Sequence, residues 1–305
     1  FGSSHIDPGR LALKHRDRMR IKRLGLRLIS SMEPVPKKAK VSVDVARWKF
    51  MSAWFCPYAQ RAWIALNHHN VPYDKIEALT LKQQPGETLK DVKGYEKHPL
   101  LLKHHPSGLV PTIIDSAEEL PAVYDSLTCV QFADDLAVAG AVAGREPLLP
   151  LDPVPRARAR MWAEWLDKNV CAQLYNILVP KDVERRRESY AKLCQSLKKF
   201  QAEIAGPYFL GEHLSIVDIA AIPWCHRILS CRILEHYRGP DFALDAQEFA
   251  PLLRWMEVCL SNASVSSTLA DKQALIDSYK RYADGTAESK VADAVRSGKN
   301  AHQHD

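Results

Sequence analysis

One cysteine, Cys56, has the sequence surroundings of a reactive thiol: it lies in the run Phe55-Cys56-Pro57-Tyr58-Ala59. Pro57 has no N–H to lose and suits the first position of a helix, which would put Cys56 at the N-cap. A sulfur there faces the free N–H groups of Tyr58 and Ala59 and the positive end of the helix dipole, and both favour thiolate over thiol. We therefore expect a nucleophile with a lowered pKa. The alternative is a buried structural cysteine that happens to precede a helix.

A strand, a helix and a second strand must hold this cysteine in place. Residues 48–52 alternate as a strand, and apolar side chains recur at helical spacing from Ala59 to Leu66. Residues 73–79 form the second strand, so the unit implies a parallel pair with a right-handed crossover. Residues 80–108 are predicted to be a lysine-rich loop followed by a weak helix that includes Tyr95.

The next segment supplies groups that could bind a peptide and an anion. Residues 109–115 predict a strand opened by proline, and Val110-Pro111 is a candidate cis bond because only an X-Pro bond reaches cis cheaply. A cis turn would present the N–H and C=O of Val110 to an extended peptide. After a short strand at 122–124, Asp125 and Ser126 begin a helix, whose N-terminus can bind anions. This order of elements is thioredoxin-like.

The second half of the chain is predicted to be helical. Glycines and prolines between residues 140 and 155 indicate a linker. Ser215 and Asp218 have the spacing of a capping box. We expect an α/β thioredoxin-like N-terminal domain at 47–139, an all-α C-terminal domain at 156–283 and a disordered polar tail at 284–305. The expected helices cover residues 156–178, 182–205, 216–238, 247–262 and 266–282.

The charge of the chain is concentrated in a basic leader. Residues 1–40 hold 11 Lys and Arg against 3 Asp and Glu, whereas the whole 305-residue chain has a formal charge of +6, so the rest is slightly acidic. Nucleic-acid binding by the folded body is not indicated. The leader, residues 1–46, fits a mitochondrial transit peptide, a solvated basic tail or vector-derived residues equally well. We expect a cytoplasmic protein, or a mitochondrial one if the leader is native.

Neither a disulfide scaffold, a metal site nor a membrane span is expected. The seven cysteines are odd in number and show no C-x-x-C spacing, which favours a reducing compartment. The histidine pairs at 68–69 and 104–105 are expected to be solvated rather than to bind metal. No apolar run approaches the roughly 20 residues of a membrane helix.

Four segments together resemble the omega class of glutathione S-transferases and the related thiol-dependent reductases. They are residues 55–59, 108–111, 124–126 and 210–218, and the resemblance covers roughly residues 47–283. It implies that Cys56 forms a mixed disulfide with glutathione. Other residues would bind the tripeptide: Phe55, Tyr58, Lys82, Leu109, Val110, Pro111, Asp125 and Ser126. Lys82 would hold the glycine carboxylate, with Lys103 or His104 as alternatives.

The residue three positions after Cys56 is Ala59, so a second thiol is missing and an external one must resolve the mixed disulfide. The sequence therefore indicates a glutathione-dependent thiol transferase, with dehydroascorbate reductase activity and use of trypanothione left open. Conventional conjugation is less favoured, because transferases that activate glutathione place a Tyr or Ser hydroxyl at this position. Small-molecule thiols and disulfides are the expected partners, and the resemblance implies a homodimer.

A second-substrate site is expected between the two domains. Its candidate residues are Trp162, Trp165 and Trp224, together with Tyr175 and His226; the alternative is that the tryptophans belong to the core. Two non-enzymatic hypotheses remain. One is a protein like the chloride intracellular channels, which share the fold and insert in membranes, and the other is a docking subunit of a translation or synthetase complex.

Overall fold

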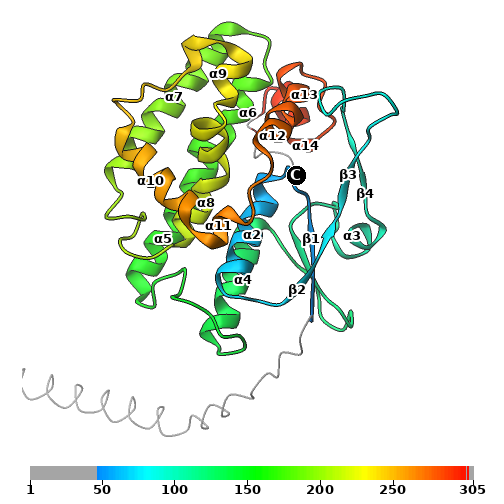
Figure 1. Cartoon of the computed structure of the whole chain (residues 1–305), viewed down its shortest axis with the longest axis vertical. Coiled ribbons are helices and arrows are strands. Elements are labelled where there is room, and N and C mark those ends of the chain that lie inside the picture. The colour runs from blue at the N-terminus through cyan, green and yellow to red at the C-terminus, as the bar shows by residue number, and fades with distance from the viewer. Residues whose placement is uncertain (1–46, 300, 302–305) are drawn as a thin grey trace, which may run out of the picture. The chain divides into compact units, whose positions relative to one another are not determined.

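Strand β1 (Trp48–Ser52) lies inside a four-stranded sheet of order β2-β1-β5-β6 (Figure 1). It pairs in parallel with β2 (Tyr73–Glu77) and antiparallel with β5 (Thr112–Asp115), which pairs with β6 (Val123–Tyr124). The predicted parallel strand pair is thus confirmed. The computed structural model describes residues 47–299 and 301, and the predicted leader at 1–46 lies outside these described residues.

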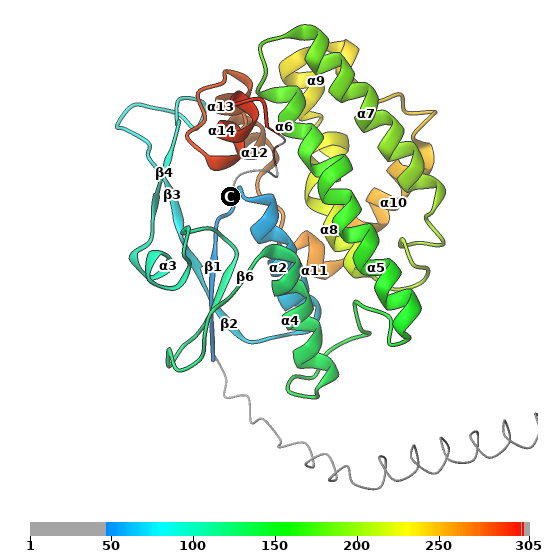
Figure 2. The ribbon, with the colours of Figure 1, turned by 180° about the vertical axis from the view of Figure 1, so that it is seen from behind.

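Two helices cover the face of this sheet that is turned toward the helical half. Helices α2 (Pro57–His68) and α4 (Ser126–Val138) lie between the sheet and the C-terminal helices, as the opposite views in Figures 1 and 2 show. Ala62, Ala65 and Leu66 of α2 are fully inaccessible to solvent, so the apolar side of this helix is buried. The thioredoxin-like domain therefore carries the N-terminus of α2 at the boundary between the two halves.

A small second sheet replaces part of the predicted loop and weak helix. Strand β3 (Leu79–Leu81) pairs antiparallel with β4 (Tyr95–Lys97), and α3 (Pro99–His104) follows. The prediction that Tyr95 is helical is wrong, because the edge of β3 supplies backbone partners that outweigh a weak local helical preference. Tyr95 pairs with Leu81 in this ladder.

The C-terminal half consists of helices around α8 (Ile216–Cys225), every residue of which is buried. The predicted capping box of Ser215 and Asp218 is confirmed, since the Ser215 hydroxyl and the Asp218 carboxylate each bond the other's backbone. Around α8 are α5 (Pro153–Leu166), α6 (Ala172–Leu178), α7 (Val183–Ala202), α9 (Ile233–Arg238), α10 (Ala250–Ser261), α11 (Ala263–Ser266), α12 (Lys272–Ser278), α13 (Lys280–Ala283) and α14 (Lys290–Arg296). Turns of π-helix join α5 to α6 at Asp167–Cys171 and extend α8 at His226–Ser230, and a 3₁₀ turn covers Pro240–Phe242.

Several expected helices are divided and one was missed. The predicted helix 216–238 breaks before α9, where Arg232 has a φ of 52°. The prediction of a disordered tail is wrong for residues 284–299, because α14 buries Ala292 and Val295 against the core, and the Glu288 N–H donates to the Lys93 carbonyl at 2.9 Å. Residues 300 and 302–305 of the predicted tail lie outside the described residues. The buried side chains of this segment are small, mostly alanine, and they stand between polar residues, so the sequence shows no strong hydrophobic pattern here.

Two further features bear on function. His68 and His69 are buried rather than solvated, with Nε2 atoms 3.0 Å from the Glu146 carbonyl oxygen and the Asp134 carboxylate, respectively. The described helices include none that is both long and apolar enough to span a membrane.

Candidate active site

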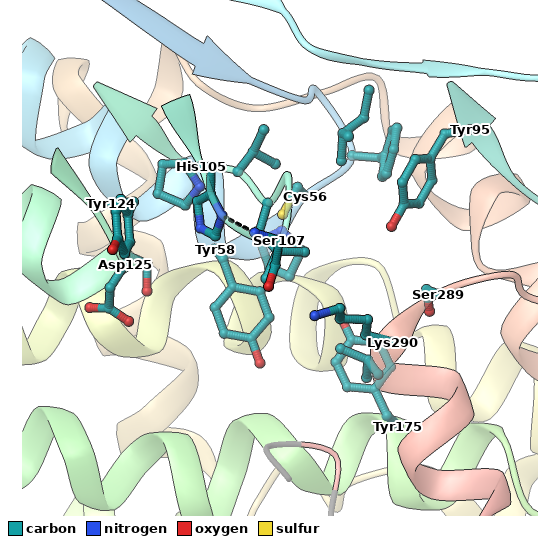
Figure 3. Close-up of a pocket in the computed structure, with 18 of the residues that line it drawn as sticks. Cys56, Tyr58, Tyr95, His105, Ser107, Tyr124, Asp125, Tyr175, Ser289 and Lys290 are labelled. Carbon is teal, nitrogen blue, oxygen red and sulfur yellow. Dashed lines mark hydrogen bonds between the residues drawn. The ribbon is translucent and has the colours of Figure 1, made fainter. Parts of the chain in front are cut away.

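A cavity of 590 Å³ opens at the N-terminus of α2, between the two halves of the molecule (Figure 3). It contains eight of the nine residues that the sequence indicated for catalysis or glutathione binding: Phe55, Cys56, Tyr58, Leu109, Val110, Pro111, Asp125 and Ser126. Residues distant in sequence are thus brought together by the start of α2, the turn before β5 and the start of α4.

Cys56 is half-buried at the N-cap of α2, as predicted from Pro57. The prediction of a lowered pKa is wrong. Burial raises the pKa of the Cys56 thiol, and this outweighs the amides of Ala59 and Tyr58 and the charge of Arg227, which lower it. The helix N-terminus acts in the expected direction, but the sequence did not reveal how far the surrounding protein removes the sulfur from water.

The turn before β5 presents backbone groups to the cavity. The Val110-Pro111 peptide bond is cis. Within the described part of the chain, the N–H of Val110 donates no hydrogen bond to protein, although Val110 lines the cavity. The Thr112 hydroxyl donates to the Leu109 carbonyl at 2.8 Å, which fixes the turn from the strand side. An extended peptide could therefore pair with the Val110 backbone.

The start of α4 forms the opposite end of the cavity. Asp125 has a φ of 71°, in the left-handed region that non-glycine residues rarely adopt, and its carboxylate accepts from the Thr128 N–H at 3.0 Å. The Ser126 hydroxyl accepts from Nη1 of the fully buried Arg61 at 3.2 Å. Nη2 of Arg61 also bonds the Asp167 carboxylate at 2.5 Å, so this pair ties α2 and α4 to the helical half.

The expected ligands for a glycine carboxylate lie elsewhere. Lys82 is not among the residues that line the cavity, and Lys103 and His104 both bond the carboxylate of Glu118. Lys82 begins the loop that joins β3 to β4, and its N–H donates to the Gly94 carbonyl across that loop at 3.1 Å, which holds Lys82 at the hairpin.

A different cationic cluster faces the cavity beside the turn. His105 and Lys290 line it (Figure 3). The Nζ of Lys97, which is not itself a lining residue, donates to the carbonyl of the lining residue Ser107 at 2.8 Å. Burial lowers the pKa of Lys97, and the charge of Lys290 lowers it further. Burial also lowers the pKa of His105, with contributions from Lys97 and Lys290. The like charges of Lys97 and Lys290 disfavour each other, and the lowered pKa of His105 favours its neutral form, so an anion beside the two ammonium groups would be stabilised.

The tryptophans predicted for a second-substrate site do not line the cavity. Trp224 is fully buried behind Tyr58, with ring centroids 4.7 Å apart. Trp162 packs on Trp165 at 5.0 Å and on Phe209 at 5.2 Å. Trp162 and Trp224 belong to the hydrophobic core and Trp165 packs against it, because large aromatic side chains bury much apolar surface in such positions.

Part of the cavity wall comes from segments that the sequence did not indicate. Tyr175 of α6 faces the opening, as its predicted place near a second-substrate site suggested, whereas His226 does not line it. The C-terminal segment contributes the remaining side, and the missed residues there include Tyr279, Arg281, Tyr282, Ser289 and Lys290. The recurrence of small apolar residues after Gly285 is a signal that could have located Ser289 and Lys290.

Two protein-family models match this chain. The model of the glutathione S-transferase N-terminal domain matches residues 55–136, and that of the C-terminal domain matches residues 183–257. Glutathione S-transferase U13 of Arabidopsis thaliana is 30% identical over 217 residues, which are 68% of this chain and 84% of the relative. Probable glutathione S-transferase parA of Nicotiana tabacum is 28% identical over 221 residues, covering 71% and 86% of the two chains.

Solved structures have the same fold. Glutathione transferase Omega 3C of Trametes versicolor superimposes with a TM-score of 0.60 at 27% identity, covering 75% of this chain and 92% of its own. A Tau class glutathione S-transferase of Mangifera indica gives a TM-score of 0.60 at 25% identity, with coverages of 78% and 97%. A rice enzyme solved in complex with glutathione shares the fold at 22% identity and a TM-score of 0.60, covering 77% of this chain and 95% of its own.

Proposed function

Because the chain belongs to the glutathione S-transferase family, we propose that it binds glutathione in this cavity and uses Cys56 for glutathione-dependent thiol transfer. The observation that supports the proposal most directly is a cysteine sulfur at the N-cap of α2, inside the cavity. A protein thiol in this place can form a disulfide with glutathione, which a hydroxyl cannot do.

The proposed reaction proceeds by two disulfide exchanges. The Cys56 thiolate attacks the glutathione sulfur of a mixed disulfide R–S–S–G. A new bond forms between the Cys56 sulfur and glutathione, and R–S⁻ leaves and takes a proton from solvent. A second glutathione thiolate then attacks the glutathione sulfur of this adduct, which releases glutathione disulfide and restores the Cys56 thiolate. One disulfide is reduced and one is formed, so the electrons balance.

The cavity suggests how glutathione would lie. The γ-glutamyl amine would reach the carboxylate of Asp125 and its carboxylate the N-terminus of α4 at Ser126. The cysteinyl unit would pair with the backbone of Val110, next to Cys56. The glycine carboxylate would lie near Lys97 and Lys290 rather than near Lys82. Trypanothione, which contains glutathione units, is a candidate for the same site, and dehydroascorbate is a candidate oxidant.

Conjugation of glutathione to an electrophile is the second candidate function, and the raised pKa of Cys56 favours it. A neutral thiol at this position could donate a hydrogen bond to the glutathione thiolate, as a hydroxyl would. The chain resembles solved transferases of both the Omega and the Tau class to a similar degree, so the class likeness does not choose between the two reactions.

The test compares the wild-type chain with Cys56→Ser. We expect glutathione-dependent reduction of bis(2-hydroxyethyl) disulfide to fall by roughly 100-fold or more, because the nucleophile is lost. Mass spectrometry should find one glutathione adduct on the wild type, at Cys56. Cys194→Ser, which removes another half-buried cysteine, is the matched control and should retain activity. Full disulfide reduction by Cys56→Ser, or conjugation of 1-chloro-2,4-dinitrobenzene as the main activity of both proteins, would refute thiol transfer.

A further inference from the structure

Arg281 is a buried cation at the cavity, and no described residue pairs with its side chain through an ion pair or a side-chain hydrogen bond. Only 3% of its surface is exposed, and it lines the cavity from α13. Among the described residues its side chain forms no ion pair, and its buried Nε and Nη1 atoms have no hydrogen-bond partner. Its guanidinium is 4.9 Å from the ring centroid of Phe55 and 5.5 Å from that of Tyr282, so the group lies against two aromatic rings.

The other buried arginines around the site have hydrogen-bond acceptors for their terminal nitrogens, although the Nε of Arg227, like that of Arg281, has no partner among the described residues. Arg61 bonds the Asp167 carboxylate, the Ser126 hydroxyl and the Ala220 carbonyl. Arg227 bonds Gln60 and two backbone carbonyls. A buried guanidinium without such partners destabilises a protein, because burial removes water and nothing replaces its hydrogen bonds. Arg281 is therefore arranged to receive an anion that is not part of the described chain.

The position of Arg281 places such an anion near the reactive sulfur. Phe55, which it contacts, directly precedes Cys56, and the ring centroids of Phe55 and Tyr95 are 6.2 Å apart. Burial raises the pKa of Tyr95 to about 12, and both Cys56 and Arg281 act on it electrostatically. The anion site and the thiol thus share one end of the cavity.

The wall next to Arg281 is aromatic. Tyr282 lies 5.2 Å from Tyr175 and 5.5 Å from Tyr279, measured between ring centroids, and all three line the cavity. This end therefore combines flat apolar surfaces with one cation. The two ends already assigned to glutathione, at Asp125 and at Lys290, lie on other elements.

We propose that the second substrate of this protein carries an anionic group, a carboxylate or sulfonate, on an aromatic body, and that Arg281 binds that group while the tyrosines hold the ring. The inference rests on the proposed function for the identity of the reaction, but the binding site itself does not depend on it. Arg281 then selects anionic over neutral substrates and directs their reacting atoms toward Cys56.

The test uses two fluorescent probes that differ by one anionic group. 8-Anilinonaphthalene-1-sulfonate carries a sulfonate, and N-phenyl-1-naphthylamine has the same rings without it. Their dissociation constants are measured on the full chain, with glutathione present, for wild type, Arg281→Gln and Arg281→Lys. We expect Arg281→Gln to weaken the sulfonate by roughly tenfold or more, with little change for the neutral probe. Arg281→Lys should retain part of the preference. Arg254→Gln, an equal charge change at an exposed site, is the control.

Three results would overturn the proposal. Equal loss of both probes with a lower melting temperature would show that Arg281 holds the fold. Unchanged sulfonate binding would show that it binds no such anion. Weakened glutathione binding, with the probes unaffected, would assign Arg281 to glutathione instead. Because no turnover is measured, these outcomes are separate from those of the Cys56→Ser experiment.

Discussion

Nη2 of Arg227 donates a 3.0 Å hydrogen bond to the carbonyl oxygen of Phe55, the residue directly before Cys56. Nη1 of the same side chain bonds the Gln60 amide oxygen at 3.1 Å, one turn into α2. An arginine of the helical half therefore supports both sides of the N-cap. Its charge lowers the pKa of the Cys56 thiol, whereas Glu77 raises it from the other domain.

This arrangement predicts opposite effects for two substitutions. Thiolate forms as the pH rises through the pKa, so alkylation of Cys56 should accelerate with pH and reach its midpoint above the ordinary thiol value of about 8.5. Arg227→Gln removes the cation and should move the midpoint to higher pH, which slows alkylation at pH 7.5. Glu77→Gln should move it to lower pH. Iodoacetamide labelling followed by mass spectrometry at Cys56 measures all three curves.

The control for this prediction is Arg227→Lys, which keeps the charge and should keep a midpoint close to that of the wild type. If Arg227→Gln and Glu77→Gln moved the midpoint in the same direction, the electrostatic explanation would be wrong. A wild-type midpoint well below 8.5 would instead restore the prediction made from the helix N-terminus alone.

Local signals account for what could be predicted from the sequence. Pro57 marks the start of α2, and the Ser215–Asp218 spacing marks the start of α8, because each acts within one helical turn. Short apolar segments predicted the four strands of the main sheet, whereas β4 was missed because its residues fell within the expected weak helix. Glutathione S-transferase domains match both halves, so the fold that the sequence and its resemblance implied is confirmed.

Properties set by distant contacts could not be predicted in this way. The pKa of Cys56 depends on its burial by the surrounding fold and on Arg227, which is 171 positions later in the numbering. Lys290 enters the cavity only because α14 packs back toward the thioredoxin-like half. Neither effect leaves a pattern in the local sequence, and the same holds for the core position of Trp224.

Replacement of Lys290 should weaken glutathione binding specifically at its glycine end. Lys290→Met removes one cation from the cluster with Lys97 and His105, so the KM for glutathione should rise by roughly tenfold. Glutathione monoethyl ester lacks the glycine carboxylate and should bind wild type and Lys290→Met almost equally. Initial rates with both thiols measure this difference.

Lys82→Met is the matched control for that experiment, because Lys82 is an exposed lysine that does not line the cavity. It should leave both KM values unchanged. A large effect of Lys82→Met with none of Lys290→Met would return the carboxylate site to the position that the family resemblance implied.

The ion pair of Asp167 with the fully buried Arg61 should contribute more to stability than an exposed ion pair does. Asp167→Asn would leave the Arg61 guanidinium, whose side chain is 0% exposed, without its counter-ion. We expect the free energy of unfolding to fall by about 3 kcal/mol, measured by urea denaturation. Glu164→Gln is the control, because its pair with Lys168 has side chains 67% and 64% exposed and should contribute less than about 0.5 kcal/mol. Equal losses in the two variants would show that burial does not strengthen the Arg61 pair.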